Sequence, residues 1–362
     1  MSEFTDQRIL VVGGAGFVGS NLVKRLLEAG PREVRIIDNL LSAERANVPE
    51  DARVTFIEGS ITDDRILREL ENDFAYVFHL ATYHGNQSSM HDPLADHENN
   101  TLTTLKLYER IKNFDKLRRV VYSSAGCTVA EKTYDEAQAT EENAPVSLYL
   151  DSPYQISKII GELYSNYYFM QHKLPVVKAR FQNVYGPGEI LGAGRWRGTP
   201  ATVWRNVTPT FVYRGLKQMP LTVENDGIAT RDFIFVDDIV RGLMLCASKG
   251  EPGEVYNLAS GVETSIGELA RLVNEQTGNP TPIENLPPRT WDHSGKRFGS
   301  TGKSKKALGF EPQVNLAAGL RRTIEWTRQN LAFIDACIDK HREQLMRSSA
   351  SSSQQQQQQQ RA

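Results

Sequence analysis

A tyrosine and a lysine four residues apart, Tyr154 and Lys158, form the pair best suited to proton chemistry in this chain. The segment continues with a helical spacing of apolar residues, so the two side chains share one helix face. A phenol has a pKa near about 10, and a neighbouring ammonium group favours its phenolate. Lowering that pKa by about three units needs about 4 kcal/mol of differential stabilisation. We therefore interpret Tyr154 as an acid/base group and Lys158 as its partner.

A glycine-rich turn near the N-terminus lies between a β-branched run and a helical pattern, which is the setting of a dinucleotide site. Gly13 permits a tight bend, and Gly16 lets the backbone approach a pyrophosphate at the helix N-terminus. Gly19 lets the helix lie close to the strand. We expect Phe17 and Val18, between these glycines, to lie beside the cofactor.

The second strand of the pattern, residues 33–37, ends in Asp38, which we expect at the ribose of the cofactor, with Asn39 as a further cofactor contact. A carboxylate suits a free 2′-hydroxyl and repels a 2′-phosphate, so the sequence predicts NAD rather than NADP. The oxidised nicotinamide would then share with Lys158 the task of stabilising the Tyr154 phenolate. Tyr-x-x-x-Lys also occurs on ordinary amphipathic helices, but here it follows the fifth strand of a dinucleotide fold, and this position favours catalysis.

The elements that must position these groups alternate between strands and helices. Apolar runs recur at residues 9–12, 34–37, 54–57, 76–80, 120–122 and 176–180, with helix-like segments between most of them. This alternation predicts an α/β fold with a Rossmann-type, doubly wound parallel sheet. A predicted helix at 237–248 and a predicted strand at 255–258 are assigned to the same sheet.

The character of the sequence changes after residue 182, where a segment rich in Gly, Arg, Trp and Pro predicts a substrate-binding excursion. Helices are predicted at 264–277, with Thr264 as its N-cap, and at 316–330. We expect an NAD-binding domain at 1–182 and 231–260, and a smaller, mixed substrate-binding domain at 183–230 and 261–347. Residues 348–362, rich in Ser and Gln, predict a disordered tail.

Composition narrows the class of partner. The chain has 362 residues, 40% of them hydrophobic, and a formal net charge of −2, so bulk charge gives no reason to expect nucleic acid or an anionic membrane. No apolar stretch approaches the roughly 18 residues of a membrane helix, and a cytoplasmic protein is expected. His84, His91 and His97 lack metal-site spacing, so we expect a surface loop there and no metal.

With these motifs the chain resembles the extended short-chain dehydrogenase/reductase superfamily, and within it the NAD-dependent nucleotide-sugar epimerase/dehydratase group typified by UDP-glucose 4-epimerase. Further matching segments are residues 79–81, 180–187, 206–209, 230–238 and 289–292. The resemblance implies additional cofactor contacts from Ser60, Ile61, Leu80, Ala81, Thr82 and Asn100. It implies substrate contacts from Asn183, Asn206, Arg231, Arg289 and Asp292. Two arginines from separate segments can clamp a diphosphate.

The sequence departs from the family pattern at the end of the fifth strand, where the family has a Ser or Thr that hydrogen-bonds the sugar hydroxyl. Ala125 aligns with that position, so Ser124 is the candidate third catalytic group, with Thr128 or Cys127 as alternatives. The dehydratases have an Asp-Glu pair just after this point and the decarboxylases a Glu. Gly126 and Cys127 offer no carboxylate, which argues against elimination and decarboxylation.

The sequence therefore predicts an enzyme that epimerises a nucleotide-diphosphate sugar, with C4 and a 4-keto intermediate favoured. The resemblance also implies a homodimer. The predicted helices at 100–114 and 154–172 are rich in apolar and aromatic residues, as a helical dimer interface requires. Three alternatives stay open. They are chemistry like that of GDP-mannose 3,5-epimerase using the Cys127 thiol, a nucleotide-sugar dehydratase or oxidoreductase, and a non-catalytic NAD or nucleotide-sugar sensor.

Overall fold

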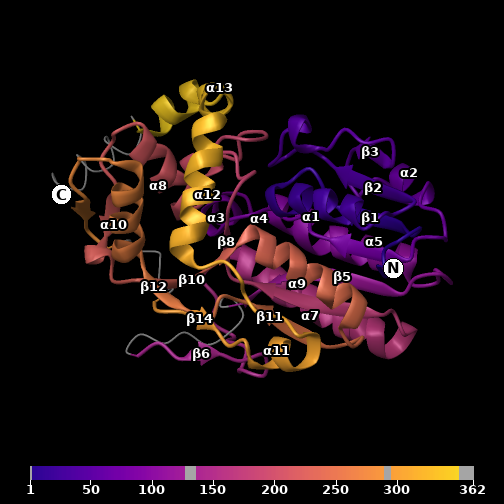
Figure 1. Ribbon diagram of the computed structural model, residues 1–362. Helices are drawn as coiled ribbons and strands as arrows, with labels where there is room; N and C mark the ends of the chain where they lie inside the picture. The colour runs from indigo at the N-terminus through magenta and orange to yellow at the C-terminus, as the bar shows by residue number, and fades with distance from the viewer. Residues whose placement is uncertain (1, 127–135, 289–294, 350–362) are drawn as a thin grey trace.

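A seven-stranded parallel sheet forms the core of the larger part of the molecule. The computed structural model describes residues 2–126, 136–288 and 295–349 (Figure 1). The strand order is β11-β7-β5-β4-β1-β2-β3, and all neighbours are parallel. The strands are β1 (Arg8–Val12), β2 (Glu33–Asp38), β3 (Val54–Glu58), β4 (Tyr76–His79), β5 (Arg119–Ala125), β7 (Val176–Phe181) and β11 (Val255–Leu258). The predicted α/β fold with a Rossmann-like parallel sheet is confirmed.

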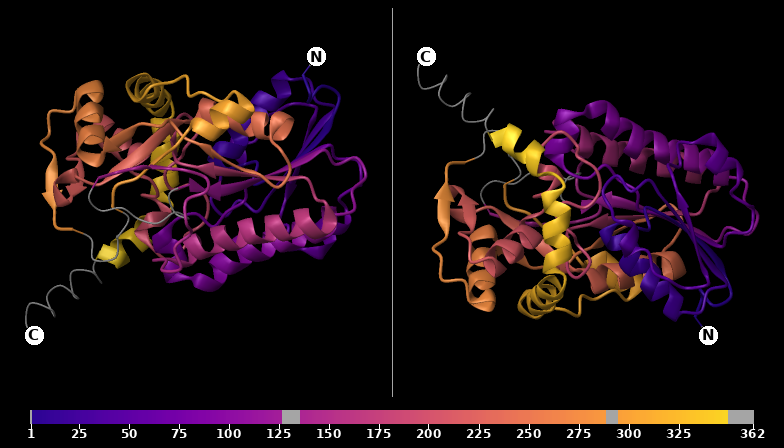
Figure 2. Two further views of the ribbon diagram at one scale, coloured as in Figure 1. Left: turned by 90° about the horizontal axis from the view of Figure 1, so that it is seen from below. Right: turned by 90° about the horizontal axis from the view of Figure 1, so that it is seen from above.

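Helices cover both faces of this sheet because its strands are apolar on both sides. In β1, Ile9 and Val11 pack into the cluster that contains α1 (Phe17–Glu28) and α9 (Val236–Lys249). Leu10 and Val12 point to the other face, toward α5 (Thr103–Ile111) and α7 (Pro153–His172). Figure 2 shows α7 and α5 running side by side along that face. Burial on both faces is the reason that these strands read as continuous apolar runs.

The larger part of the molecule also contains several short elements. They are α2 (Asp64–Arg68), α3 (Asn86–His91), α4 (Pro93–Asp96), the π-helical turn η2 (His97–Leu102), α11 (Gly302–Leu308) and the 3-10 turn η1 (Arg45–Asn47). The helix predicted at 100–114 is thus divided, with its first residues in the π-helical turn. The segment that carries His84, His91 and His97 was expected to be a surface loop, and most of it is helical instead.

The smaller part of the molecule is mixed, as expected, and lies at the left in Figure 1. β10 (Thr230–Phe235) runs parallel to β8 (Asn183–Tyr185) and antiparallel to β12 (Glu263–Ser265). Two short parallel pairs join β9 (Thr222–Glu224) to β13 (Glu284–Leu286), and β6 (Ala139–Thr140) to β14 (Phe298–Gly299). The helices are α8 (Val207–Leu216), α10 (Ile266–Thr277), α12 (Leu316–Gln329) and α13 (Leu331–Asp339), with 3-10 turns η3 (Pro200–Thr202) and η4 (Asn225–Gly227).

The start of α10 corrects one prediction. Thr264 was expected to cap this helix, but it lies in β12 opposite Arg231 of β10. The cap is Ser265, whose hydroxyl accepts a hydrogen bond from the Glu268 N–H at 3.0 Å. Thr264 was misassigned because its backbone pairs with a strand that is distant in sequence.

Candidate active site

A cavity of about 870 Å³ lies at the carboxyl ends of the parallel strands and extends between the two parts of the molecule. Parallel sheets bind ligands at this edge, and the volume is that of a large ligand site. The cavity brings together almost every described residue that the sequence placed at the site. These are Gly13, Gly16, Phe17, Val18, Gly19, Asp38, Asn39, Ser60, Ile61, Leu80, Ala81, Thr82, Ser124, Tyr154, Lys158, Asn183, Asn206 and Arg231.

Close packing accounts for two of the three glycines in the N-terminal turn. Gly13 has φ +87°, and a Cβ there would lie 2.5 Å from the Ala81 nitrogen. A Cβ at Gly19 would lie 2.2 Å from the Gly13 carbonyl oxygen. Gly16 faces the cavity, where a Cβ would meet only the Gly13 carbonyl oxygen, at 3.3 Å. Its predicted contact with a pyrophosphate stays a prediction.

Asp38 ties β2 to the glycine turn. Its Oδ2 accepts from the Ala15 N–H at 3.0 Å and its Oδ1 from the Leu40 N–H at 2.9 Å. Burial raises the pKa of this carboxyl despite these hydrogen bonds. The same backbone donors hold the carboxylate beside the turn.

Tyr154 and Lys158 lie together on α7 and face the cavity. Lys158 is 3% exposed, donates from Nζ to the Ser123 carbonyl oxygen at 3.0 Å, and has its Nζ 5.8 Å from the Tyr154 ring centre. Burial lowers the pKa of Lys158 to about 8. Burial, and then the charge of Asp96, raises the pKa of Tyr154. The protein's own groups thus act against the lowering of the Tyr154 pKa that the pairing with Lys158 predicted.

The serines at the end of β5 already have partners within the protein. Ser123 donates to the His79 carbonyl oxygen at 3.0 Å, and Ser124, 3% exposed, donates to Glu162 Oε1 at 2.5 Å. Glu162 is also held by a bidentate ion pair with Arg180, with both contacts at 2.8 Å. This buried pair draws the Ser124 hydroxyl toward α7. The alternatives Thr128 and Cys127 lie outside the described residues.

His84 lines the cavity beside Tyr154, which the sequence analysis missed. The two rings meet edge to face with centroids 5.9 Å apart. Burial, followed by the charges of Arg197 and Arg205, lowers the pKa of His84 to about 3, so its imidazole is neutral. The available signal was its place five residues after His79, at the carboxyl end of the fourth strand.

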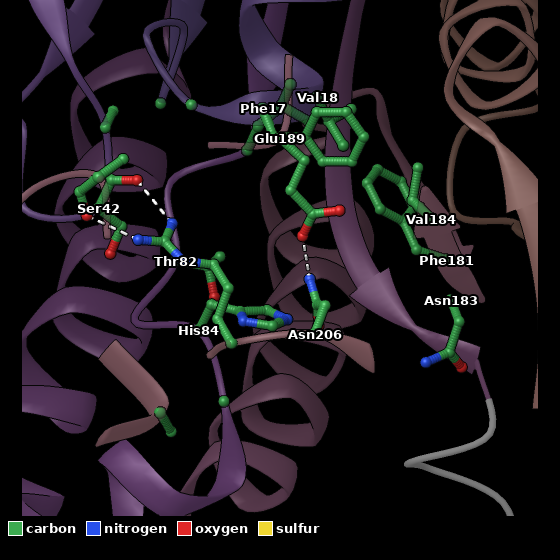
Figure 3. Close-up of a pocket in the computed structure, with 18 of the residues that line it drawn as sticks. Phe17, Val18, Ser42, Thr82, His84, Phe181, Asn183, Val184, Glu189 and Asn206 are labelled. Carbon is green, nitrogen blue, oxygen red and sulfur yellow. Dashed lines mark hydrogen bonds between the residues drawn. The ribbon is translucent and has the colours of Figure 1, made fainter. Parts of the chain in front are cut away.

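Glu189 is a second cavity residue that the sequence analysis did not identify. Asn206 donates from Nδ2 to Glu189 Oε1, and Figure 3 shows this pair beside His84 in the cavity. Glu189 is 5% exposed, and its Oε2 has no partner among the described residues. Burial raises the pKa of this carboxyl to about 7, against the opposing effects of Asn206 and Arg205.

The predicted arginine clamp is described only in part. Arg231 lines the cavity and donates to the Thr230 carbonyl oxygen at 2.7 Å and the Gly295 carbonyl oxygen at 2.9 Å. Arg289 and Asp292 lie outside the described residues. Arg205, Arg214 and Arg297 also line the cavity and bring positive charge to it.

Asn100 is buried behind the cavity and is not among its lining residues. Its Oδ1 accepts from the Tyr83 N–H at 2.7 Å and from the Thr82 hydroxyl at 3.0 Å. Its Nδ2 donates to Asp96 Oδ1 at 2.8 Å and to the Ser157 hydroxyl at 3.1 Å. The structure thus gives Asn100 a positioning role between the segment after β4 and α7. Its predicted contact with the cofactor stays a prediction.

The described ranges contain neither a metal-binding cluster nor a membrane-spanning helix. Within them, no three His, Cys, Asp or Glu side chains cluster in a way that could hold a metal ion. None of the helices there has both the length and the apolar character needed to cross a bilayer.

Comparison with known proteins identifies relatives along almost the whole chain. The pattern of the NAD dependent epimerase/dehydratase family matches residues 9–259. A UDP-glucose 4-epimerase from Mycolicibacterium smegmatis is 33% identical over 328 residues, covering 89% of this chain and 98% of that protein. A dTDP-glucose 4,6-dehydratase from Streptomyces antibioticus is 29% identical, covering 90% of this chain and 93% of that one.

A solved structure is also similar to this chain, at higher sequence identity. The Bordetella bronchiseptica enzyme WbmF, in complex with NAD⁺ and UDP, is 60% identical with a TM-score of 0.86. The match covers 96% of this chain and 99% of that one.

Proposed function

Because this chain belongs to the NAD-dependent epimerase/dehydratase family and its cofactor is NAD, we propose that it epimerises a nucleotide-diphosphate sugar at C4 through a 4-keto intermediate. One observation carries the proposal. A single cavity joins the glycine turn, the Tyr154–Lys158 pair and a polar wall that includes Asn183, Asn206 and Arg231. Cofactor and sugar nucleotide can therefore meet at the acid/base pair.

The residues of the cavity fit a dinucleotide. No side chain in the described ranges caps the first turn of α1, so its N–H groups and the helix dipole suit a pyrophosphate. Asp38, Asn39 and Ser60 would hold the adenosine end, and Lys158 would hold the nicotinamide ribose. When NAD is bound, it supplies a positive charge and a carbon that accepts hydride.

We assign the proton chemistry to α7. Tyr154 Oη removes the proton of the sugar hydroxyl as the carbon is oxidised and returns it after the keto sugar has turned. Because burial raises the pKa of Tyr154, the phenolate needs positive charge within the cavity, from Lys158 and the oxidised nicotinamide. The sugar must be held loosely and its diphosphate firmly, which agrees with the arginines that line the cavity.

The end of β5 favours epimerisation over elimination. Gly126 lines the cavity where the resemblance places the acidic pair of the dehydratases, and a Cβ there would lie 2.0 Å from Gln182 Nε2. A carboxylate at this position would require Gln182 to move. Ser124, the third group that the sequence predicted, would have to release Glu162 before it could bond the sugar. The UDP bound to WbmF supports a uridine nucleotide.

We also propose a homodimer built on α7. Ile156, Leu163, Tyr167 and Met170 recur at helical spacing on its exposed side, and Leu163 is 61% exposed. An apolar stripe of this kind on a surface helix suits a helix of a second copy.

Incubation with UDP-, GDP-, CDP- and TDP-sugars in deuterated water, followed by NMR and mass spectrometry, tests the proposed reaction. We expect one sugar to give an isomer of unchanged mass without deuterium, and Tyr154→Phe to abolish it. Tyr149→Phe, at an exposed tyrosine, is the matched control. Deuterium at C3 or C5 would favour the Cys127 chemistry, loss of water a dehydratase, and binding without turnover a sensor. Each of these results would contradict the proposal.

A further inference from the structure

We propose that His84 is a catalytic residue whose imidazole binds the sugar oxygen that Tyr154 deprotonates, in place of the hydroxyl that the family carries at the end of the fifth strand. The inference rests on the proposed function and deepens it. The hydroxyl of Ser123 donates to the His79 carbonyl oxygen, and that of Ser124 donates to Glu162. Ala125, the next residue of β5, has no polar side-chain atom.

His84 lies where a partner of Tyr154 is needed. Its ring lines the cavity and meets the Tyr154 ring at 5.9 Å, edge to face. Neither ring nitrogen is hydrogen-bonded to another residue in the described part of the chain. Figure 3 shows the ring directed into the cavity near Asn206. Both nitrogens are therefore available to a ligand.

The backbone on either side of this ring is fixed. Arg197 donates from Nη1 to the His84 carbonyl oxygen at 2.7 Å, and its guanidinium carbon lies 5.4 Å from the centre of the Tyr83 ring. Asn100 accepts from the Tyr83 N–H and donates to Ser157 on α7. One buried asparagine thus links the segment that carries His84 to the helix that carries Tyr154. A catalytic hydrogen bond needs positioning of this kind.

The charge state of the ring suits the role. Burial, followed by the charges of Arg197, Arg205 and Lys158, lowers the pKa of His84 and keeps the imidazole neutral. A neutral imidazole has one N–H donor and one acceptor. It can therefore bond a hydroxyl before oxidation and a ketone oxygen after it, without taking a proton.

Oxidation removes one proton and one hydride from the sugar. The sugar O–H bond breaks and its proton passes to Tyr154 Oη, while the C–H bond breaks and its hydride, with the electron pair, passes to NAD⁺. A C=O bond forms at the same carbon. His84 donates a hydrogen bond to this oxygen throughout and exchanges no proton, and reduction on the other face reverses each transfer.

Holoenzyme variants mixed with UDP-glucose, UDP-galactose, UDP-N-acetylglucosamine and UDP-glucuronate test the inference. The readouts are the absorbance of reduced nicotinamide in a single turnover and the affinity for UDP by calorimetry. We expect His84→Phe to slow oxidation about 10²- to 10³-fold, the usual effect of losing one such donor. Affinity for UDP should change less than about twofold, and His84→Gln, which keeps an N–H, should recover about tenfold. His97→Gln, at an exposed histidine on η2, is the matched control.

Four results would overturn the inference in different ways. One such result is that the wild-type protein reduces its cofactor with one of these sugars and His84→Phe does so equally fast. Another is that Thr128→Val alone abolishes oxidation. In either case His84 is not the partner of Tyr154, and the proposed function stands. If the wild-type protein oxidises none of these sugars and none of the GDP-, CDP- and TDP-sugars, the proposed function fails, and the role of His84 fails with it. A parallel loss of rate, UDP affinity and melting temperature in His84→Phe and His84→Gln would show a merely structural role.

Discussion

At the scale of single residues, the cavity holds several ionisable groups whose pKa values are displaced by burial. Lys158 and His84 are both shifted toward their neutral forms, as is the Glu189 carboxyl. Desolvation is the first cause in all three cases. Groups with displaced pKa values cluster at functional sites, because catalysis needs pKa values matched to the reaction.

Glu189 gives a prediction about stability and pH. Its pKa is about 7 in the folded chain against an ordinary value of 4.5, so between these values the unfolded chain releases a proton that the folded chain keeps. The free energy of unfolding should therefore fall as pH rises from about 4.5 to 7. At about 1.4 kcal/mol per pH unit, the loss amounts to about 3 kcal/mol.

Glu189→Gln should remove this part of the pH dependence, because an amide does not titrate. Urea unfolding of wild type and variant at pH 5 and pH 8 measures it, with the exposed Glu343→Gln as control. A difference between wild type and Glu189→Gln that does not change with pH would contradict the prediction.

At the scale of elements, α13 supports the segment that carries Glu189, Arg197 and Asn206. Ile334, Cys337 and Ile338 of α13 form one apolar cluster with Ile190, Leu191, Ala193 and Val203. His341, just after the helix, bonds through Nε2 to the Gly192 carbonyl oxygen at 3.0 Å. A C-terminal helix thus holds one wall of the cavity.

Ile334→Ala should therefore affect both stability and binding. Removing a buried isoleucine side chain costs about 2–4 kcal/mol, and we expect affinity for UDP to fall as the 188–206 segment loosens. Chemical denaturation and calorimetry with UDP measure the two effects. Phe333→Ala, on the partly exposed side of the same helix, is the matched control. A stability loss with unchanged affinity for UDP would mean that α13 does not support this wall.

At the scale of the whole molecule, the apolar stripe on α7 leads to a prediction about assembly. Leu163→Glu places a charge in the centre of this stripe and should convert a dimer into a monomer, since an unpaired charge buried in an interface is costly. Sedimentation velocity distinguishes the two states. Met346→Glu places the same charge at an exposed methionine outside α7 and should leave the dimer intact. A monomeric wild-type protein would reject the proposed dimer.

The sequence predicted the parallel sheet well because its signals are local. Strands buried on both faces need unbroken apolar runs, and the glycine turn needs residues without side chains at fixed positions. For the same reason Tyr154 and Lys158 were identified correctly as neighbours on one helix face, and NAD followed from the turn and Asp38.

Only the tertiary structure decided which other groups reach the cavity and which are occupied elsewhere. Ser124 was predicted from its place on β5, but its bond to Glu162 depends on the packing of α7, 38 residues away. Asn100 links Tyr83 to Ser157, a contact between distant segments that its place in the sequence does not reveal. Thr264 was assigned to a helix because its pairing with Arg231 is not visible locally.

His84 and Glu189 were missed for a related physical reason. Their roles come from burial, from the charges of Arg197 and Arg205, and from contacts with Tyr154 and Asn206. Desolvation and Coulombic effects act through space, so spacing along the chain carries no sign of them. The sequence by itself determined the sheet, the NAD cofactor and the place of Tyr154 and Lys158 on one helix face. The environment that completes the site around that pair arises only when the chain folds.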